Sequence, residues 1–289
     1  MAYFRSYYLR FYIFMAEPLA LFFTDPRTLA FMHGAKDTEL DMAMHSAAYI
    51  FTQTPAADQA AIDYIRKEWA NRNDFLRVWG EANKALGPNV TIPKGLRREH
   101  LMAIHAYTQN STLHSEFNSA VSQCGGSDTI YQSKFHFKSF HYLLSVALSK
   151  LKTKRRKTFR GANELFNAKK GVKVRLGIFA STSLNQGIAK RFLKSKSNTL
   201  FEIETKLGVL ISNFSELEYE EEVLIPPIEV FKVKRKPVEE KDGQRGWRNI
   251  KLVVAGCQGI TVTVQTENGA FEVRRGKGKC PRHCKCLLA

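Results

Sequence analysis

The sequence changes character at residues 152–157, and this change limits the possible folds more than any other feature. Five of the six residues are basic, in the run Lys152-Thr153-Lys154-Arg155-Arg156-Lys157. Before the run, apolar residues recur at helical spacing. After it, short apolar segments rich in β-branched and aromatic residues alternate with turn residues. A helical half followed by a β-rich half predicts an α+β domain.

Three stretches of the first half have the spacing of amphipathic helices. They are Ala57 to Leu86, which Gly87-Pro88-Asn89 ends, Leu96 to Val121, and Phe135 to Leu151. Cys124 to Asp128 is typical of a loop. In the second half a short helix is expected from Ser183 to Leu193, with Ser183 as its N-cap. The expected strands are Thr158 to Arg160, Gly177 to Ala180, Thr199 to Thr205, Val209 to Ile211, Val223 to Ile225, Glu229 to Val233, Ile250 to Val254 and Ile260 to Gln265.

The two ends of the chain differ from the domain between them, which we place at residues 37–265 with a helical part, 37–151, and a β-rich part, 158–265. At residues 1–36, basic residues precede an apolar run that Glu17 and Pro18 interrupt. This pattern favours a signal, an anchor or an N-terminal extension. Residues 266–289 form a basic tail that contains cysteines. No run reaches the ~18 apolar residues of a membrane span.

The net charge of +17 indicates attraction to polyanions, such as nucleic acid, an acidic membrane surface or a phosphate-rich cofactor. Charge alone does not choose among them, and residues 152–157 fit either a solvated linker or a polyanion patch. Three of the five cysteines, Cys280, Cys284 and Cys286, lie near the C-terminus. A structural zinc site usually needs two separated ligand pairs, so oxidised or unpaired cysteines are favoured over metal.

Three consecutive acids, Glu220 to Glu222, run directly into the apolar segment Val223-Leu224-Ile225. If the strand includes them, its period of two places Glu220 and Glu222 on one face. Two carboxylates directed into one place suit acid–base chemistry or stabilisation of a cation. The alternative is an exposed acidic turn before a buried strand.

Two upstream segments carry complementary chemistry. Arg160, at the end of an expected strand, can bind a pyrophosphate through its planar guanidinium, and Gly161 lets the backbone approach a flat ligand. In Ser181-Thr182-Ser183, the hydroxyls at a strand end can bind a carboxylate or a ribose. Each segment alone is a weak signal.

In this order, the three segments resemble the arginine–serine–glutamate signature of the mono-ADP-ribosyltransferases, and most closely the vertebrate ecto-enzymes that modify arginine. The likeness covers roughly residues 38–265. It includes Leu40 to Ala43, Phe135 to Leu144, Val174 to Leu184, Glu220 to Pro227 and Glu229 to Phe231. The resemblance implies a helical region packed on two small β-sheets that form an NAD-binding cleft, with residues 37–265 as the catalytic domain.

The resemblance also implies the role of each site residue. Arg160 would bind the NAD phosphates, and the Gly161 backbone would hold the nicotinamide amide. Ser181 would position Glu222, the catalytic glutamate that stabilises the oxocarbenium ion. Glu220 would orient or deprotonate the acceptor arginine. Thr182 and Ser183 would support the site, and Phe192 would stack near the nicotinamide.

The activity so implied is transfer of ADP-ribose from NAD to arginine side chains of proteins, without a metal. Two alternatives remain open: an NAD glycohydrolase that uses water, and a basic binding module with an idle NAD site, anchored by residues 152–157 and 234–236. The expected partners are NAD and an arginine-bearing protein, with no specific nucleic acid and a monomeric state. We expect secretion, or residence in the endoplasmic reticulum or at the cell surface, and no glycosylphosphatidylinositol tail is evident.

Overall fold

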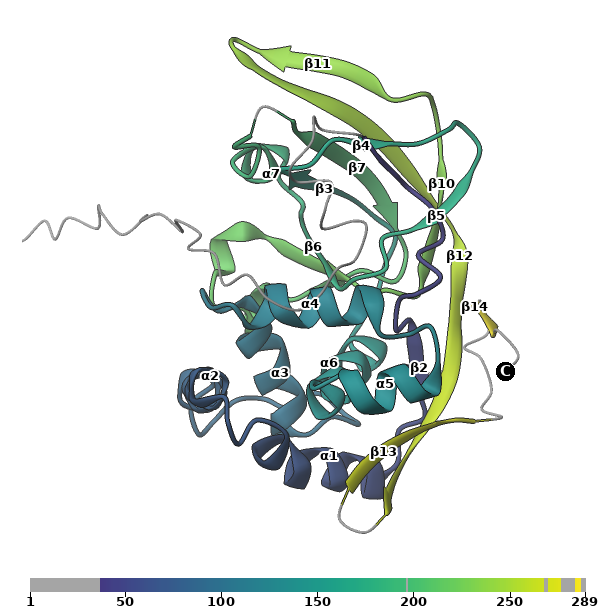
Figure 1. Ribbon diagram of the computed structural model, residues 1–289. Helices are drawn as coiled ribbons and strands as arrows, with labels where there is room; N and C mark the ends of the chain where they lie inside the picture. The colour runs from purple at the N-terminus through teal and green to yellow at the C-terminus, as the bar shows by residue number, and fades with distance from the viewer. Residues whose placement is uncertain (1–36, 196, 268–269, 277–283, 287–289) are drawn as a thin grey trace, which may run out of the picture. The chain divides into compact units, whose positions relative to one another are not determined.

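The helical half folds much as its apolar spacing predicts, but into shorter pieces (Figure 1). The computed structural model describes residues 37–195, 197–267, 270–276 and 284–286. The predicted signal or anchor at residues 1–36 lies outside them. The helices of the first half are α1 Pro55–Glu68, α2 Asn73–Ala85, α3 Arg98–Thr108, α4 Leu113–Gln123, α5 Asp128–Lys134 and α6 Lys138–Lys150.

Local capping explains where two of these helices begin. The Thr54 side chain accepts a hydrogen bond from the Ala57 amide, and Pro55 occupies the first turn of α1, where a missing N–H costs nothing. The Ser127 hydroxyl caps α5 in the same way, through the amide of Ile130. The helix α5 therefore starts at the end of the segment predicted as a loop.

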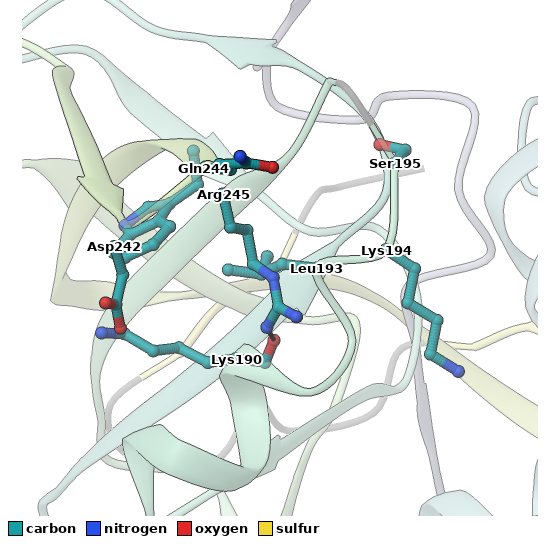
Figure 2. Close-up of a pocket in the computed structure, with 8 residues that line it drawn as sticks. Lys190, Leu193, Lys194, Ser195, Asp242, Gln244 and Arg245 are labelled. Carbon is teal, nitrogen blue, oxygen red and sulfur yellow. Dashed lines mark hydrogen bonds between the residues drawn. The ribbon is translucent and has the colours of Figure 1, made fainter.

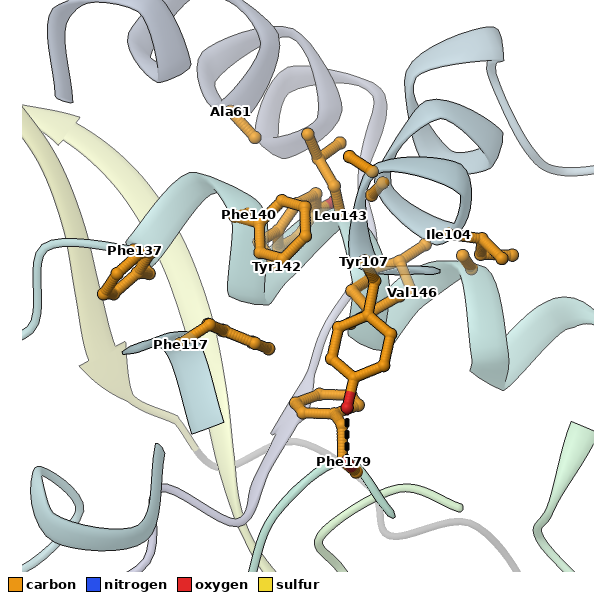
Figure 3. Packing of buried hydrophobic residues seen from close by; sticks show 14 of the residues in the cluster. Ala61, Ile104, Tyr107, Phe117, Phe137, Phe140, Tyr142, Leu143, Val146 and Phe179 are labelled. Atoms are coloured by element: carbon orange, nitrogen blue, oxygen red, sulfur yellow. Dashed lines mark hydrogen bonds between the residues drawn. The ribbon is translucent and has the colours of Figure 1, made fainter. Parts of the chain in front are cut away.

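The helices enclose a core of aromatic and aliphatic side chains, which also includes residues of the β-rich half such as Phe179 (Figure 3). The rings of Phe117 and Phe140 lie edge to face with centroids 5.0 Å apart, and Phe179 lies 5.3 Å from Phe117. Phe179 directly precedes a strand of the β-rich half. Its burial therefore fixes that strand against the helices, since a large aromatic ring contributes much of a core's packing energy.

The strands of the described residues confirm the α+β prediction. Two of them, Thr199–Thr205 and Glu229–Val233, have the predicted bounds, whereas the segments predicted at 250–254 and 260–265 belong to one long strand, β12. The strands are β1 Thr38–Glu39, β2 Tyr49–Phe51, β3 Arg156–Ala162, β4 Phe166–Asn167, β5 Lys173–Arg175, β6 Ala180–Ser183, β7 Thr199–Thr205, β8 Val209–Leu210, β9 Glu222–Ile225, β10 Glu229–Val233, β11 Val238–Asp242, β12 Arg245–Glu267, β13 Ala270–Arg275 and β14 Cys284–Cys286. Short helices α7 Gln186–Lys190, η2 Ser212–Phe214 and η3 Glu218–Glu220 lie among them.

The main path of strands runs β5-β10-β12-β7-β3-β6-β9-β8. Strands β3 and β7 pair along seven positions, but β3 and β6 pair only at Phe159 and Ser183. Two groups of strands therefore meet at a single residue pair. Beyond that pair the edges of β3 and β6 separate, and the described residues show no further pairing between these two strands.

Two local predictions are wrong. The segment predicted as a strand at 177–180 is mostly irregular, because Gly177 has a φ of 70° and the strand starts only at Ala180. Ser183 does not cap α7, because it is still in β6 and its hydroxyl donates to the Glu220 carbonyl at 2.7 Å. Asn185 caps α7 instead, accepting from the Gly187 amide at 2.8 Å.

A disulfide joins Cys257 of β12 to Cys284 of β14. The two strands pair in parallel around it. Cys124 is a free thiol among the described residues, and Cys280 lies outside them. The described helices include none with the length and apolar character that a membrane span requires.

The basic run that divides the two halves is partly neutralised by its neighbours. Arg155 pairs with Glu204, and Lys157 pairs with Glu202 at 2.9 Å. Strand β3 begins inside the run, at Arg156. The run is therefore partly a β-strand rather than wholly a linker.

Candidate active site

Arg160 lies where β3 and β6 separate. On one edge its strand position pairs with Phe201 of β7. Across the gap its Nη1 atom donates to the Ser181 carbonyl at 2.8 Å, an oxygen that a continued strand ladder would have used. Burial lowers the pKa of the Arg160 guanidinium, while the Tyr107 hydroxyl and the Glu222 carboxyl act in the opposite direction. A guanidinium held in this way is suited to a bound anion.

Gly161 is required by the chain itself. A Cβ atom at this position would lie 2.2 Å from the Ala189 carbonyl oxygen and 3.2 Å from both Leu193 Cδ2 and Phe192 Cβ. Only glycine allows α7 and the segment after it to approach β3 so closely. Phe192 itself is 45% exposed beside this glycine.

The serines and the glutamate are brought together by the pairing of β6 with β9. Ser183 lies opposite Glu222, and Ser181 lies opposite Leu224. Side chains directly opposite each other share a face, so Ser181, Ser183 and Glu222 lie on the same face. Thr182 lies on the other face and is buried, and its hydroxyl donates to the Val223 carbonyl at 2.6 Å.

Glu222 is a buried carboxyl group with few partners. Its side chain is 4% exposed, and Ser215 Oγ lies 3.4 Å from its Oε2. Burial raises its pKa to about 7, and the nearby Glu220 charge also raises it. Hydrogen bonds from Ser181 and Ser215 and the charge of Arg160 oppose this shift. Such a perturbed carboxyl group beside an arginine indicates a functional site.

Glu220 lies near Glu222 for a different reason from the predicted one. Strand β9 begins only at Glu222, Glu220 ends the helix η3, and Glu221 between them adopts a left-handed φ of 46°. The period-two explanation is therefore wrong, because Glu220 is not in the strand. The tight turn still brings the carboxyl groups close enough for the Glu220 charge to raise the pKa of Glu222.

The turn is fixed by hydrogen bonds from the serine segment. Ser183 Oγ holds the Glu220 carbonyl, and the Leu184 amide donates to the Glu221 carbonyl at 3.2 Å. Burial raises the pKa of Glu220, and the positive charge of Arg191 lowers it. Glu221 is exposed. The three consecutive acids therefore occupy three different environments.

Three residues that contact the candidate site were not predicted from the sequence. Tyr107 Oη donates to the Phe179 carbonyl at 2.6 Å, and Asn118 Oδ1 accepts from the Phe179 amide at 3.0 Å. These contacts hold the entry to β6. Ser215, which touches Glu222, lies in the glycosylation sequon Asn213-Phe214-Ser215. In sequence, each is an ordinary polar residue of a helix or loop.

Metal ligation has no support in the described structure. Among its residues, no group of three or more histidine, cysteine, aspartate or glutamate side chains is placed to hold a metal ion. The polar groups at the parting of β3 and β6 suit an organic ligand with an anionic centre and a group that becomes cationic. Arg160 would face the first, and Glu222 the second.

The family model for NAD:arginine ADP-ribosyltransferases matches residues 40–251. The GPI-linked NAD(P)(+)–arginine ADP-ribosyltransferase 1 of Oryctolagus cuniculus is 38% identical over 224 residues, which are 69% of this chain and 67% of that protein. The enzyme of the same name from Mus musculus is 43% identical over 174 residues, 57% of this chain and 52% of that protein. The chain thus spans between about half and two thirds of these relatives.

Solved structures agree with the sequence matches. The crystal structure of the eukaryotic mono-ADP-ribosyltransferase ART2.2 aligns with a TM-score of 0.63 at 26% identity, covering 86% of this chain and 98% of that one. A mutant of the same enzyme in complex with NAD aligns with a TM-score of 0.62, also at 26% identity and with the same coverage. The chain belongs to the NAD:arginine ADP-ribosyltransferase family. The resemblance and the fold predicted from the sequence are thereby confirmed, and ADP-ribosyl transfer is favoured over the two alternatives.

Proposed function

We propose that the protein transfers ADP-ribose from NAD to arginine side chains of other proteins. The observation that supports this most is the buried Glu222 carboxyl group, which shares a face with Ser181 where β3 parts from β6, near Arg160. Family membership supports NAD as the donor and arginine as the acceptor. The basic overall charge also suits an anionic cosubstrate.

Bond cleavage would use the residues around the strand gap. Arg160 would bind the pyrophosphate, the Gly161 backbone would hold the nicotinamide amide, and Phe192 would stack on the ring. As the bond between the ribose carbon and nicotinamide breaks, nicotinamide leaves with the bonding electrons and positive charge develops on the ribose. The Glu222 carboxylate, held by Ser181, would stabilise that charge in a site with little water.

Transfer would need a second carboxylate, because an arginine guanidinium is protonated and therefore a poor nucleophile. Glu220 would orient the acceptor and take its proton as a guanidinium nitrogen bonds to the ribose carbon. The half-buried position and raised pKa of Glu220 suit a proton acceptor. Thr182 and Ser183 would support the reaction indirectly, since their hydroxyls bind the backbone of β9 and of the turn before it.

The direct test is incubation with NAD labelled in its ADP-ribose half and a peptide containing one arginine. The proposed function predicts a labelled peptide that survives separation from free nucleotide, with less free ADP-ribose than peptide product. A peptide with lysine in place of arginine is the matched control. Release of nicotinamide with only free ADP-ribose would identify a glycohydrolase instead.

We also propose that the protein is exported, as the names of its GPI-linked and ecto-enzyme relatives suggest. The Cys257–Cys284 disulfide supports an oxidising environment. The sequon asparagines Asn89, Asn110 and Asn213 are all exposed. Protein from the medium of secreting cells should carry this disulfide in peptide mass mapping. Recovery only from the cytosol with both thiols reduced would contradict export.

A further inference from the structure

A cavity outside the candidate active site adjoins the segment that packs on Gly161. Its volume is about 770 Å³. One wall is the segment that ends α7 and continues to residue 195, and the other is the turn that joins β11 to β12 (Figure 2). The lining residues are Lys190, Leu193, Lys194, Ser195, Asp242, Gln244, Arg245 and Trp247.

The cavity has an excess of positive charge. Lys190, Lys194 and Arg245 oppose a single acid, Asp242. Within the described part of the chain, none of the three cations takes part in an ion pair, whereas other surface cations such as Arg155 and Lys157 do. Unpaired cations gathered in a concave surface attract an anionic ligand.

The cavity is built on a fixed base. Trp247 is 4% exposed, and its indole N–H donates to Glu240 Oε2 at 3.1 Å. The Lys190 ammonium lies 4.5 Å from the centre of the Trp247 ring, and Arg245 Nη1 reaches the Lys190 carbonyl at 3.5 Å. These contacts restrict the positions of two of the three cations. A ligand would therefore meet charges that are largely in place, which lowers the entropic cost of binding.

One residue connects this cavity to the candidate active site. Leu193 lines the cavity, and its Cδ2 atom would lie 3.2 Å from a Cβ atom at Gly161. Its neighbour Phe192 is exposed beside the same glycine. The cavity and the Arg160-Gly161 part of β3 thus both contact one short segment. A protein whose arginine entered the active site could reach both.

We propose that this cavity docks an acidic segment of the acceptor protein, an inference that rests on the proposed function. The volume exceeds what one small anion fills, so the ligand is extended, such as a peptide with several aspartate or glutamate side chains. A continuous polyanion such as nucleic acid fits less well, because three cations within one cavity match a short acidic segment rather than a long charged backbone. The site would favour arginines that lie near acidic residues in the acceptor.

Peptide binding tests the site without relying on activity. A fluorescent peptide with one arginine and an acidic cluster would be titrated with the wild type and with the double variant Lys194→Glu, Arg245→Glu. We expect the dissociation constant to rise about tenfold, because two attractive contacts become repulsive. The variant Lys241→Glu is the matched control, since this exposed lysine is in the same hairpin but does not line the cavity. It should change binding much less.

Kinetics then locate the effect. The double variant should raise KM for the acidic peptide and leave KM unchanged for NAD and for a peptide with asparagine and glutamine in place of the acids. Equal effects on both peptides, a rise in KM for NAD alone, or tighter binding of heparin than of the peptide would each overturn the proposal. Peptide binding that depends on Lys194 and Arg245, without any transfer to arginine, would support docking and contradict the proposed function.

Discussion

Two buried glutamates, Glu222 and Glu229, lie on either side of Pro226-Pro227 and differ in the groups that hydrogen-bond to them. Glu229 is 1% exposed and accepts hydrogen bonds from the amides of Lys206 and Leu207, at 2.6 and 3.0 Å, and from the Thr205 hydroxyl. Glu222 is 4% exposed and accepts hydrogen bonds from the Ser181 and Ser215 hydroxyls, the latter at 3.4 Å. Burial raises the pKa of both carboxyl groups.

The difference shows that burial alone does not identify a catalytic carboxyl group. Three donors from the end of β7 and the turn that follows it hold the Glu229 side chain, so this carboxylate stabilises the fold. Glu222 has hydroxyl donors instead of backbone amides, and it lies near a guanidinium. A buried carboxylate held by hydroxyl groups beside a ligand site can stabilise a cation that appears during the reaction.

The largest expected effect follows from replacing Glu222 with glutamine. The amide keeps the shape but removes the negative charge, so nicotinamide release should fall by about 10²–10³. Release would be followed by chromatography at saturating NAD. Far-UV circular dichroism should match the wild type. A fall below tenfold would mean that Glu222 does not carry the charge stabilisation.

The Glu229→Gln variant should show the reverse pattern. Glutamine cannot accept the same three hydrogen bonds with both side-chain atoms, so the free energy of unfolding should fall by about 2–3 kcal/mol. Urea titration would measure this loss. The rate of nicotinamide release per folded molecule should stay within about twofold of the wild type, since this residue is distant from bond cleavage in the proposed scheme.

The stability of Glu222→Gln should also depend on pH differently from the stability of the wild type. The Glu222 pKa is about 7 in the folded protein against 4.5 for an unperturbed group, so the folded state binds the proton more tightly. The stability that this proton gives is complete below pH 4.5 and is lost as the pH rises through 7. Glu222→Gln should therefore gain about 1–2 kcal/mol of stability over the wild type at pH 8, and little at pH 4.

Thermal unfolding of the wild type and of Glu222→Gln at several pH values would measure this difference in stability. The wild-type kcat/KM should rise with pH through about 7, as Glu222 ionises in the free enzyme. A stability difference that stays constant with pH would show that the carboxyl group is already ionised in the folded protein at low pH.

The smallest expected effect concerns Glu221, whose φ of 46° is unfavourable for residues other than glycine. Glu221→Gly should raise the unfolding free energy by about 0.5–1 kcal/mol, because glycine adopts this conformation without strain. Glu221→Gln keeps the strain and should leave stability and both reactions nearly unchanged. Urea titration of the pair separates the backbone effect from the loss of charge. Equal stability of Glu221→Gly and Glu221→Gln would contradict a strained backbone at this position.

Much of the fold could be predicted because its signals are local. Helical spacing, proline and glycine stops, and β-branched runs found most helices and gave the bounds of Thr199–Thr205 and Glu229–Val233. The length of β12 was not predictable. Its middle, from Ala255 to Gly259, contains two glycines and reads as a break, but pairing with β10 and β14 keeps it extended.

The sequence selects candidate site residues, but it does not predict their geometry. The sequence pattern selected Arg160, Ser181 and Glu222 as candidates. It placed Glu220 in a strand, whereas in the structure Glu220 ends a helical turn and is followed by Glu221 with a left-handed φ. It gave no sign of Ser215 or Tyr107, because their contacts join segments far apart in the chain. Such contacts depend on tertiary packing, which no local pattern encodes.

The roles of Glu220 and Glu222 are the central claim, and one experiment tests it directly. Wild type, Glu220→Gln and Glu222→Gln would be assayed in parallel for nicotinamide and for ADP-ribosyl-arginine on a peptide. Glu222→Gln should lose both products. Glu220→Gln should keep most nicotinamide release and lose transfer, with water taking the ADP-ribose. Equal loss of both products in the two variants would contradict this division of roles.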